Sequence, residues 1–429
     1  MGRATKRVSR RAVLKEYGAA AGLLAAIGVS PAAVAAQETS DAAEGEPKPG
    51  GALIVAIPQS VQVLNPVDRA AGGPLSFVMQ QIFEGPLRSA AASPMLEPGF
   101  AEQVEVSPDG LVYTIRLRPG LTFHDGSPLD AAAYKFSLEM VLKADSPGHL
   151  DTYIPWEDRF GGTLAIEAVD PLTLTLTLSQ PAVNLDYELS GLNYMAVNPA
   201  VVQADPEGWG RNPVGTGSGP FAFEEFVPDQ TVSYTRFDDY WEEGKPYLDR
   251  LIVLTLPEFG SRLLALSSGD IHVMPVQGGE IAEAERDPNV QIITGPPSSV
   301  HFLLFDHADP VVGLKAVRQA ISQAIVREAL VAELLPSSIV ADNLAIMPGV
   351  AGRRDDLTWY PTNPDGARQL LTEAGFADGI DVTLTYSRTF PLPDTTFLAQ
   401  AIQAQLAEVG IRLTLEEVDT GALFQAVYP

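Results

Sequence analysis

The sequence has 429 residues, with 54 acidic against 28 basic side chains, a formal net charge of −26 and no cysteine. An acidic surface repels nucleic acid, and the absence of thiols excludes disulfides, thiolate metal sites, cysteine nucleophiles and lipid-bearing cysteines. A chain of this length exceeds what one hydrophobic core usually supports, so we expect at least two domains. The acidity indicates a soluble or salt-adapted surface or, alternatively, an acidic cleft for cationic ligands.

The first 36 residues have the composition of an export leader. Six basic residues precede an apolar run at 17–29, which is the order found in secretory signals. Ser9–Lys15 fits a twin-arginine signal, with cleavage after Ala35 or the next residue. The alternative is a membrane anchor, but the run contains three glycines and is shorter than the roughly 20 residues that span a bilayer. We expect a periplasmic or otherwise extracytoplasmic location, reached through the twin-arginine translocase, without a lipid anchor on cysteine.

A flexible linker is expected at 37–51, which is rich in Ala, Glu, Gly and Pro. Apolar runs and alternating patterns bounded by turn residues then predict strands through the first two-thirds of the chain. The predicted strands are 53–57, 111–117, 172–178, 221–226, 232–237 and 251–256. A helix is predicted after Asp130, which precedes an apolar run and can cap its first turn.

The spacing of apolar residues becomes helical after Lys315. Residues 317–335 predict one long amphipathic helix. Asn363 can cap a further helix that has Pro364 in its first turn and Gly375 at its end.

A strand, a helix and a second strand are predicted at 381–386, 395–409 and 411–418. This order and spacing imply parallel pairing of the strands with a right-handed crossover. Together with the earlier strands, the unit predicts an α/β fold of two lobes. Lobe I is expected at 52–272, with a β-rich subdomain, and lobe II at 273–429.

Several sequence blocks occur in an order that is typical of one family. Residues 100–141 contain SPDG, a strand that ends in LRPG, the turn FHDGSPLDA and the start of a helix. The other blocks are QQIFEGPL at 80–87, NPVGTG at 212–217, DYW at 239–241, GKPYLD at 244–249 and SGDIHV at 268–273. This ordered set resembles the family 5 solute-binding proteins of ABC importers, the group that includes dipeptide, oligopeptide and nickel binders.

The resemblance implies a two-lobed periplasmic-binding-protein fold, type II-like and of cluster C, with a hinge and a ligand cleft between the lobes. Binding by hinge closure, not catalysis, is the implied activity. The default ligand is a di- or oligopeptide held through its main chain; nickel chelates, opines and oligosaccharides are the alternatives. The implied partners are ABC permease subunits with their ATPase subunits. We expect a monomer without a cofactor, a metal site or a nucleic acid partner.

Complete members of the family continue beyond the equivalent of Pro429 and carry there an aspartate that binds the free amino group of a peptide. We therefore expect this chain to be a fragment or the product of a truncated gene, with lobe II incomplete. An incomplete lobe would leave strand edges unpaired, which predicts poor stability in isolation.

Five candidate cleft residues come from the ends of the two parallel strands. Asp419 and Thr420 follow the second strand, where the resembled peptide binders place residues that line the cleft. Tyr386, Ser387 and Arg388 end the first strand, and ligands of open α/β sheets bind at such carboxyl ends. Arg388 can hold a carboxylate through a bidentate contact; the alternative is a solvated loop arginine.

Three further candidates lie in the first lobe. Tyr153 and Trp156 can form an aromatic wall of the cleft or, alternatively, pack within the lobe. Asn65 follows the opening strand and resembles a family loop that faces the cleft, although a plain turn explains it equally well.

Other polar motifs are interpreted as structural. The turn at 216–219 precedes a strand and not a helix, so it lacks the amides that cradle a phosphate. His301 and His307 can share one face of a predicted strand, but about 20 Å would separate them, too far for one metal ion. His124 and His272 lie in family blocks and are expected to be structural.

Two other classes of function stay open as alternatives. An exported enzyme is disfavoured because HExxH and Gly-x-Ser-x-Gly motifs are absent from the sequence. The carboxylate pairs Glu224–Glu225 and Glu416–Glu417 lie on predicted strands, where adjacent side chains point to opposite faces and cannot act on one bond. A signalling receptor or chaperone-like protein could use the same fold.

Overall fold

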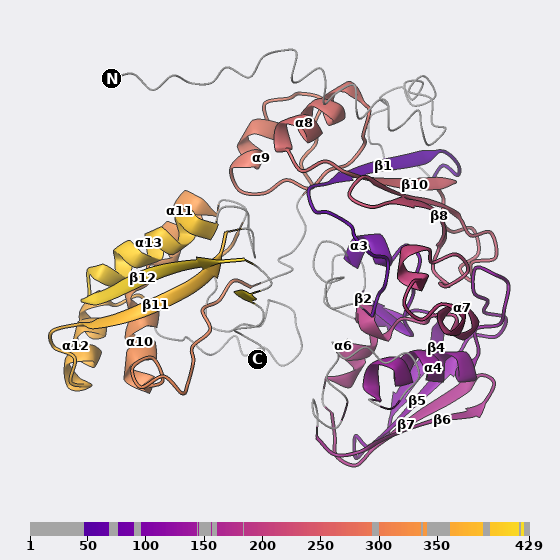
Figure 1. Ribbon diagram of the computed structural model, residues 1–429, viewed down its shortest axis with the longest axis horizontal. Helices are drawn as coiled ribbons and strands as arrows, with labels where there is room; N and C mark the ends of the chain where they lie inside the picture. Colours follow the sequence, from indigo (N-terminus) through magenta and orange to yellow (C-terminus); the bar gives the residue numbers. More distant parts are fainter. Residues whose placement is uncertain are drawn as a thin grey trace. The chain divides into compact units, whose positions relative to one another are not determined.

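The computed structural model describes most of the chain from residue 47 onward (Figure 1). The described residues are 47–67, 76–89, 96–143, 145, 156, 161–182, 184–293, 300–335, 338–340, 361–388, 395–419 and 422–423. They form two compact units. The first unit comprises the described residues up to Pro275 together with Asp287–Val290. The second comprises Val276–Arg286 and the described residues from Gln291 onward. None of the helices among the described residues is both long and apolar enough to cross a bilayer.

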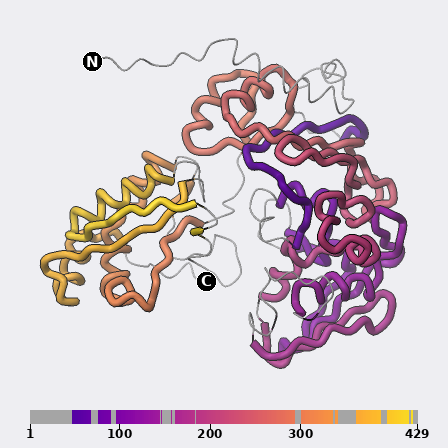
Figure 2. Tube along the Cα trace, in the orientation of Figure 1, coloured from indigo at the N-terminus to yellow at the C-terminus, as the bar shows by residue number. Residues whose placement is uncertain are grey.

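The first unit contains a mixed four-stranded sheet of order β1-β10-β9-β8. These strands are Ala52–Ile57, Arg250–Thr255, Thr231–Arg236 and Phe221–Val227. The strand β1 pairs in parallel with β10, with Ala52 opposite Arg250, and in Figures 1 and 2 the indigo β1 lies beside the rose-coloured β10. The other two pairings are antiparallel. Segments that are far apart in the sequence therefore complete one sheet.

A second sheet of the first unit is antiparallel, with the order β4-β5-β7-β6. These strands are Ala101–Val106, Val112–Leu117, Thr173–Leu178 and Leu164–Asp170. Alternate residues of β5 and β7 are buried, as expected for strands with one face in the core. The helix α4, Ala131–Leu142, contacts β6 and β7, and the predicted cap is confirmed, since Asp130 Oδ1 accepts from the Ala133 N–H at 2.9 Å.

Shorter elements complete the first unit. They are α3 (Ser76–Met79), β2 (Leu87–Ser89), β3 (Leu96–Pro98), α6 (Leu185–Leu189), η3 (Leu192–Tyr194), α7 (Pro199–Ala204), η4 (Trp209–Arg211) and α8 (Phe259–Ser268). Two of them, β2 and β3, form a separate two-stranded antiparallel sheet. The six strands predicted from the sequence in this part of the chain are confirmed to within one residue at each end.

The glycine-rich turn at 216–219 packs directly on the backbone near Ile82. The Gly219 N–H donates to the Ile82 carbonyl oxygen at 2.7 Å, and a Cβ atom on Gly217 would lie 2.1 Å from that oxygen. Glycine is needed here because no side chain fits between the two backbones. The strand β8 follows at Phe221, so the interpretation of the turn as a packing feature is confirmed.

The second unit is built around two parallel strands, β11 (Ile380–Ser387) and β12 (Ile411–Val418). The helix α13, Thr395–Ala407, contacts both strands (Figure 1). The predicted strand, helix and parallel strand are thereby confirmed. A separate hydrophobic core includes Ile321, Leu371, Ile402, Leu406 and Ile411.

The remaining helices of the second unit are α9 (Gly279–Ala284), α10 (Lys315–Ala324), α11 (Arg327–Leu334) and α12 (Pro364–Glu373). The Asn363 cap of α12 is confirmed, since its Oδ1 accepts from the Gly366 N–H at 3.0 Å. The prediction of one long helix over 317–335 is wrong, because Ile325 and Val326 have non-helical backbone angles and separate α10 from α11. The Val326 N–H donates instead to Oε1 of Gln405 at 2.9 Å, so a side chain of α13 stabilises the break.

Candidate functional site

The carboxyl ends of β11 and β12 lie side by side because the strands pair in parallel without a register shift. Ile380 opposes Ile411 at one end, and Tyr386 opposes Glu417 near the other. A left-handed Gly410, with φ of 88°, precedes β12, and its carbonyl oxygen accepts from the Ile380 N–H at 3.0 Å. Ligands of open α/β sheets bind at carboxyl ends. This end of the pair is therefore our candidate functional site.

Arg388 forms an ion pair with Glu417 at this end. Its Nη2 lies 2.8 Å from Oε1 and 3.0 Å from Oε2 of the carboxylate. The Arg388 side chain is 60% exposed and that of Glu417 is 39% exposed. The Tyr386 hydroxyl donates to Glu417 Oε2 at 3.4 Å. Arg388 thus binds a carboxylate of the chain itself, and its contact with a ligand carboxylate stays a prediction.

The other candidates at the strand ends have different surroundings. Tyr386 and Ser387 are 9% and 2% exposed, so both residues are buried at the end of β11. Asp419 is exposed, and its Oδ1 accepts from the Ala422 N–H at 2.9 Å. Its carboxylate therefore makes a local hydrogen bond just beyond β12. Thr420 lies outside the described residues.

The predicted aromatic wall lies only partly within the described residues. Trp156 is 1% exposed and belongs to the core of the first unit, so the structure places it as a packing residue and not on a surface that a solute can reach. A large apolar ring in this position stabilises the unit through burial. Tyr153 lies outside the described residues.

Asn65 lies in a buried turn of the first unit. Its side chain is largely enclosed, with 9% of the residue exposed, and its Oδ1 accepts from the Val67 N–H at 2.9 Å. The neighbouring Leu64 N–H donates to the carbonyl oxygen of Gly210 at 2.6 Å. This local hydrogen bonding is that of an asparagine turn, which is the alternative that the sequence left open.

Glu417 belongs to the candidate site, although it was not predicted to do so. Glu416 and Glu417 were predicted only to be a pair whose side chains point to opposite faces of a strand. That geometry is confirmed, because Glu416 accepts from the Thr385 hydroxyl at 3.0 Å whereas Glu417 contacts Arg388. The predicted parallel pairing could have identified Glu417, because it places the penultimate residues of the two strands opposite each other.

A buried ionisable cluster in the first unit was also missed. Glu84 is 6% exposed, and its two oxygens accept from the Tyr240 hydroxyl at 3.0 Å and from Trp241 Nε1 at 2.8 Å. Burial raises the pKa of Glu84 to about 7, because loss of water disfavours the charged form more than the hydrogen bonds and nearby Arg88 favour it. Glu84 thus joins the QQIFEGPL block to the DYW block.

Arginines complete this cluster. Arg88 contacts Glu84 at 3.6 Å, Glu97 at 2.8 Å and, through a short ion pair, Glu242. The guanidinium of Arg118 lies 4.1 Å from the ring centroid of Trp241, a favourable cation–π distance. Every charged group of the cluster has a partner within the chain, so we assign it to structure and not to ligand binding.

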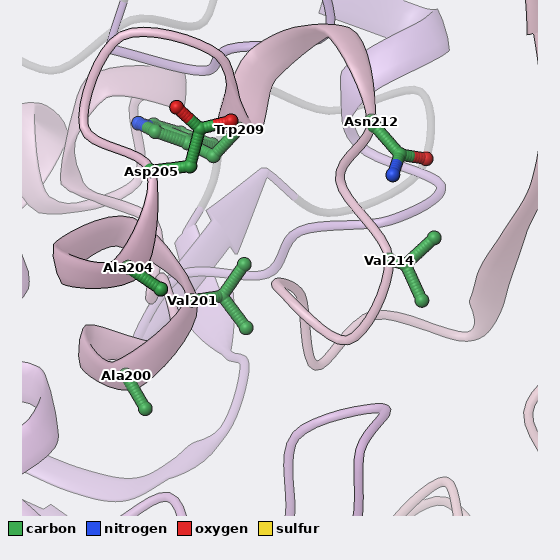
Figure 3. Close-up of a pocket in the computed structure, with 7 residues that line it drawn as sticks. All are labelled: Ala200, Val201, Ala204, Asp205, Trp209, Asn212 and Val214. Atoms are coloured by element: carbon green, nitrogen blue, oxygen red, sulfur yellow. The ribbon is translucent and has the colours of Figure 1, made fainter.

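A shallow hollow of about 370 Å³ lies beside α7 (Figure 3). Its lining residues are Ala200, Val201, Ala204, Asp205, Trp209, Asn212 and Val214. Figure 3 shows the Asp205 carboxylate beside the Trp209 indole, and that carboxylate accepts from the Gly208 N–H at 3.0 Å. The predicted site residues do not line this hollow.

Histidines do not assemble into a metal site within the part of the chain that the structure describes. No group of three or more His, Asp or Glu side chains there could hold an ion. The prediction of a strand that carries His301 and His307 is wrong, since residues 301–305 have no regular structure. His124 is structural as expected, because its Nε2 lies 2.9 Å from the Gly219 carbonyl oxygen and its ring packs edge-on against Phe237.

Comparisons with known proteins identify the class of the fold. The periplasmic binding protein DppA of Helicobacter pylori, solved with the peptide STSA, matches with a TM-score of 0.72 and 24% identity, covering 88% of this chain and 76% of DppA. AgaA of A. tumefaciens, solved with agropinic acid, matches with a TM-score of 0.69 and 25% identity, covering 87% of this chain and 74% of AgaA. The chain therefore has a periplasmic-binding-protein fold, as predicted.

The sequence comparisons give the family. The family model of bacterial extracellular solute-binding proteins, family 5 (middle region), matches residues 95–428. The glutathione-binding protein GsiB of Salmonella paratyphi A is 28% identical over 370 residues, which are 86% of this chain and 70% of GsiB. This protein belongs to the family 5 solute-binding proteins, and the relatives named here are binding proteins, not enzymes.

Proposed function

We propose that this chain is the extracytoplasmic receptor of an ABC importer. A solute would bind in a cleft between the two lobes, stabilise the closed state through its differential affinity, and be delivered to permease subunits that work with ATPase subunits. The observation that carries this proposal is the family match over residues 95–428. Binding without chemical conversion is the proposed activity, with the chain acting as a monomer.

The proposed ligand is a di- or oligopeptide. DppA is solved with a tetrapeptide and GsiB is named for a tripeptide, which supports this class. The proposed contacts are Arg388, Asp419 and Thr420 from the second unit and Tyr153 from the first, and the buried Tyr386 and Ser387 would position the end of β11. Opines, represented by the agropinic acid of AgaA, are the second candidate class; nickel chelates and oligosaccharides complete the ligand screen.

The leader at 1–36 is proposed to direct export through the twin-arginine translocase, after which the chain would be free of a lipid anchor on cysteine. The paired arginines of SRRAVLK carry this proposal. Replacing Arg10 and Arg11 with lysine should retain the chain in the cytoplasm in a cell fractionation. Normal export of that variant would overturn the assignment to this pathway.

A thermal-shift screen of the full chain tests the receptor proposal. A ligand present at 100 times its Kd adds about 2.7 kcal/mol to the stability of the native state. We expect a shift with di- and oligopeptides and none with matched concentrations of free sugars. A shift only with opines, sugars or nickel chelates would keep the receptor and change its ligand class. No shift with any solute, from protein that unfolds cooperatively, would favour a signalling, chaperone-like or enzymatic role.

A further inference from the structure

A short segment near the end of the first unit lies along the outer edge of β1. This strand is the last one of its sheet, so only one of its edges pairs with β10. On the other edge the His272 N–H donates to the Ile54 carbonyl oxygen at 2.8 Å, and the Ala56 N–H donates to the Val273 carbonyl oxygen at 3.0 Å. His272 and Val273, which we name the edge segment, thus form an isolated parallel bridge to β1 and cover main-chain groups that an edge strand would leave without partners.

The side chain of His272 supplies a further hydrogen bond between this segment and β1. Its Nδ1 accepts from the Ile54 N–H at 3.1 Å, and Ile54 is completely buried. An imidazole nitrogen therefore takes the place of the backbone carbonyl oxygen that would accept in a regular ladder. Because Nδ1 accepts a hydrogen bond, the ring is neutral and carries its proton on Nε2.

Protonation of the ring would remove this acceptor, because an imidazolium has two N–H donors and no acceptor. We propose that His272 is a pH-sensitive clamp that holds the edge segment on β1 while its ring is neutral and releases the segment when the ring is protonated. The chain enters the second unit at Val276, shortly after the edge segment. The clamp therefore fixes the point at which this connection leaves the sheet of the first unit. The inference rests on the geometry of the first unit and not on the proposed receptor function.

The surroundings of His272 determine the direction of the pH dependence. Burial lowers the pKa of His272 from its usual value of 6.5, so the clamp is closed above about pH 6.5 and opens as the pH falls through the lowered pKa. The strand β1 has no ionisable side chain. Asp270 accepts from a serine hydroxyl at 2.9 Å, Arg262 of α8 donates to backbone carbonyl oxygens at 2.6 and 2.9 Å, and Arg250 of β10 pairs with Glu224 at 2.6 Å. The charged groups of the neighbouring elements thus have partners of their own.

Hydrogen exchange of the full chain, resolved to single amides and corrected for the intrinsic chemical rate, tests the clamp between about pH 7.5 and 4.5. The Leu178 N–H is the reference amide, because it is buried in the first unit and donates to the Leu111 carbonyl oxygen at 2.8 Å. We expect the protection of Ile54 and Ala56 relative to Leu178 to fall by about 3- to 10-fold on acidification, the equivalent of one hydrogen bond. Constant ratios, or a loss at Ile54 alone, would overturn the release of the edge segment.

Three variants assign the effect to the His272 ring. His272→Asn offers an acceptor oxygen as many bonds from Cβ as Nδ1 and does not titrate, so its protection ratios should vary by less than about 2-fold with pH. His272→Ala has no acceptor and should show the low ratios at every pH. His301→Asn is the matched control, because burial also lowers the pKa of His301, and it should keep the wild-type dependence. A wild-type dependence in His272→Asn, or its loss in His301→Asn, would overturn the assignment.

Nuclear magnetic resonance of the wild type with labelled histidine measures the ring directly. The sequence contains five histidines, and the signal of His272 is the one that is absent from His272→Asn. We expect a neutral ring protonated on Nε2 and a titration midpoint below about 6.5 that coincides with the loss of Ile54 protection. A neutral ring that carries its proton on Nδ1 would overturn the clamp.

Discussion

Glu84 shows how one buried side chain can connect two distant parts of the sequence. Its oxygens accept from Tyr240 and Trp241, more than 150 residues along the chain. Burying the Tyr240 hydroxyl and the Trp241 N–H would cost free energy if they had no acceptor, and Glu84 provides one for each. Burial raises the pKa of this carboxyl group to about 7, so its charge state changes near neutral pH.

The raised pKa of Glu84 predicts a defined pH dependence of stability. A carboxyl group with a folded pKa of about 7 and an unfolded pKa near 4.5 binds its proton more tightly in the native state, so its contribution is complete below about pH 4.5 and is lost as the pH rises through 7. We expect the stability of the wild type relative to Glu84→Gln to fall by about 3 kcal/mol between pH 4.5 and 7.5. Urea unfolding of both proteins across this range measures the difference.

Only the difference between the two proteins is informative, because other groups titrate in the same range. Burial lowers the pKa of His124 to about 4, so its contribution is present above about pH 6.5 and is lost as the pH falls towards 4, the opposite direction. Arg88 and Glu242 also face Glu84 and are common to both proteins. A stability difference that stays constant with pH would show that the pKa of Glu84 is the same in the folded and unfolded states.

At the scale of elements, the break between α10 and α11 depends on a contact from outside the helices. The Val326 N–H donates to Oε1 of Gln405, which lies 79 residues further along the chain on α13. A helix end needs such partners for its unpaired backbone groups. The side chain of Gln405 therefore defines where α11 begins.

Replacing Gln405 with alanine should destabilise the second unit. The variant leaves the partly buried Val326 N–H without its acceptor, which costs about 1–2 kcal/mol. Gln400→Ala is the matched control, because Gln400 lies on the same helix and is exposed. Equal unfolding midpoints of the two variants in urea would contradict the assigned role of Gln405.

Local patterns predicted most elements and the parallel pairing of β11 with β12, but not the side-chain contacts between elements. The strands and the Asn363 cap follow from residues within one element, where alternation and capping chemistry suffice. The α10–α11 break was missed because Ile325 and Val326 fit the apolar pattern of a helix, and the Gln405 contact is not visible in that pattern. Arg388 was predicted from its place at a strand end, whereas its ion pair with Glu417 and the hydrogen bonds of Glu84 depend on which side chains face each other across different elements.

At the scale of the molecule, the two units have separate hydrophobic cores. The first core includes Leu138 and the second includes Leu371, and the two sets of buried residues do not overlap. Loss of packing in one core therefore need not disrupt the packing of the other. Domains with independent cores commonly depart from two-state unfolding.

We expect calorimetry of the full chain to resolve two unfolding transitions. Leu138→Ala should lower one transition and Leu371→Ala the other, each by the equivalent of about 2–5 kcal/mol, because both side chains are almost completely buried. Each transition is assigned to the unit whose variant lowers its midpoint temperature. A single transition that both variants lower equally would show that the units unfold as one cooperative body.

The parallel pairing of β1 with β10 has a consequence for the timing of folding. The first residue of β1, Ala52, has as its partner Arg250, so β1 emerges from the ribosome long before the strand that completes its place in the sheet. At about 5–20 residues per second, that delay is on the order of 10 to 40 s. Residues 52–57 therefore stay without their partner strand through most of the synthesis of the first unit. Their pairing with β10 completes the four-stranded sheet.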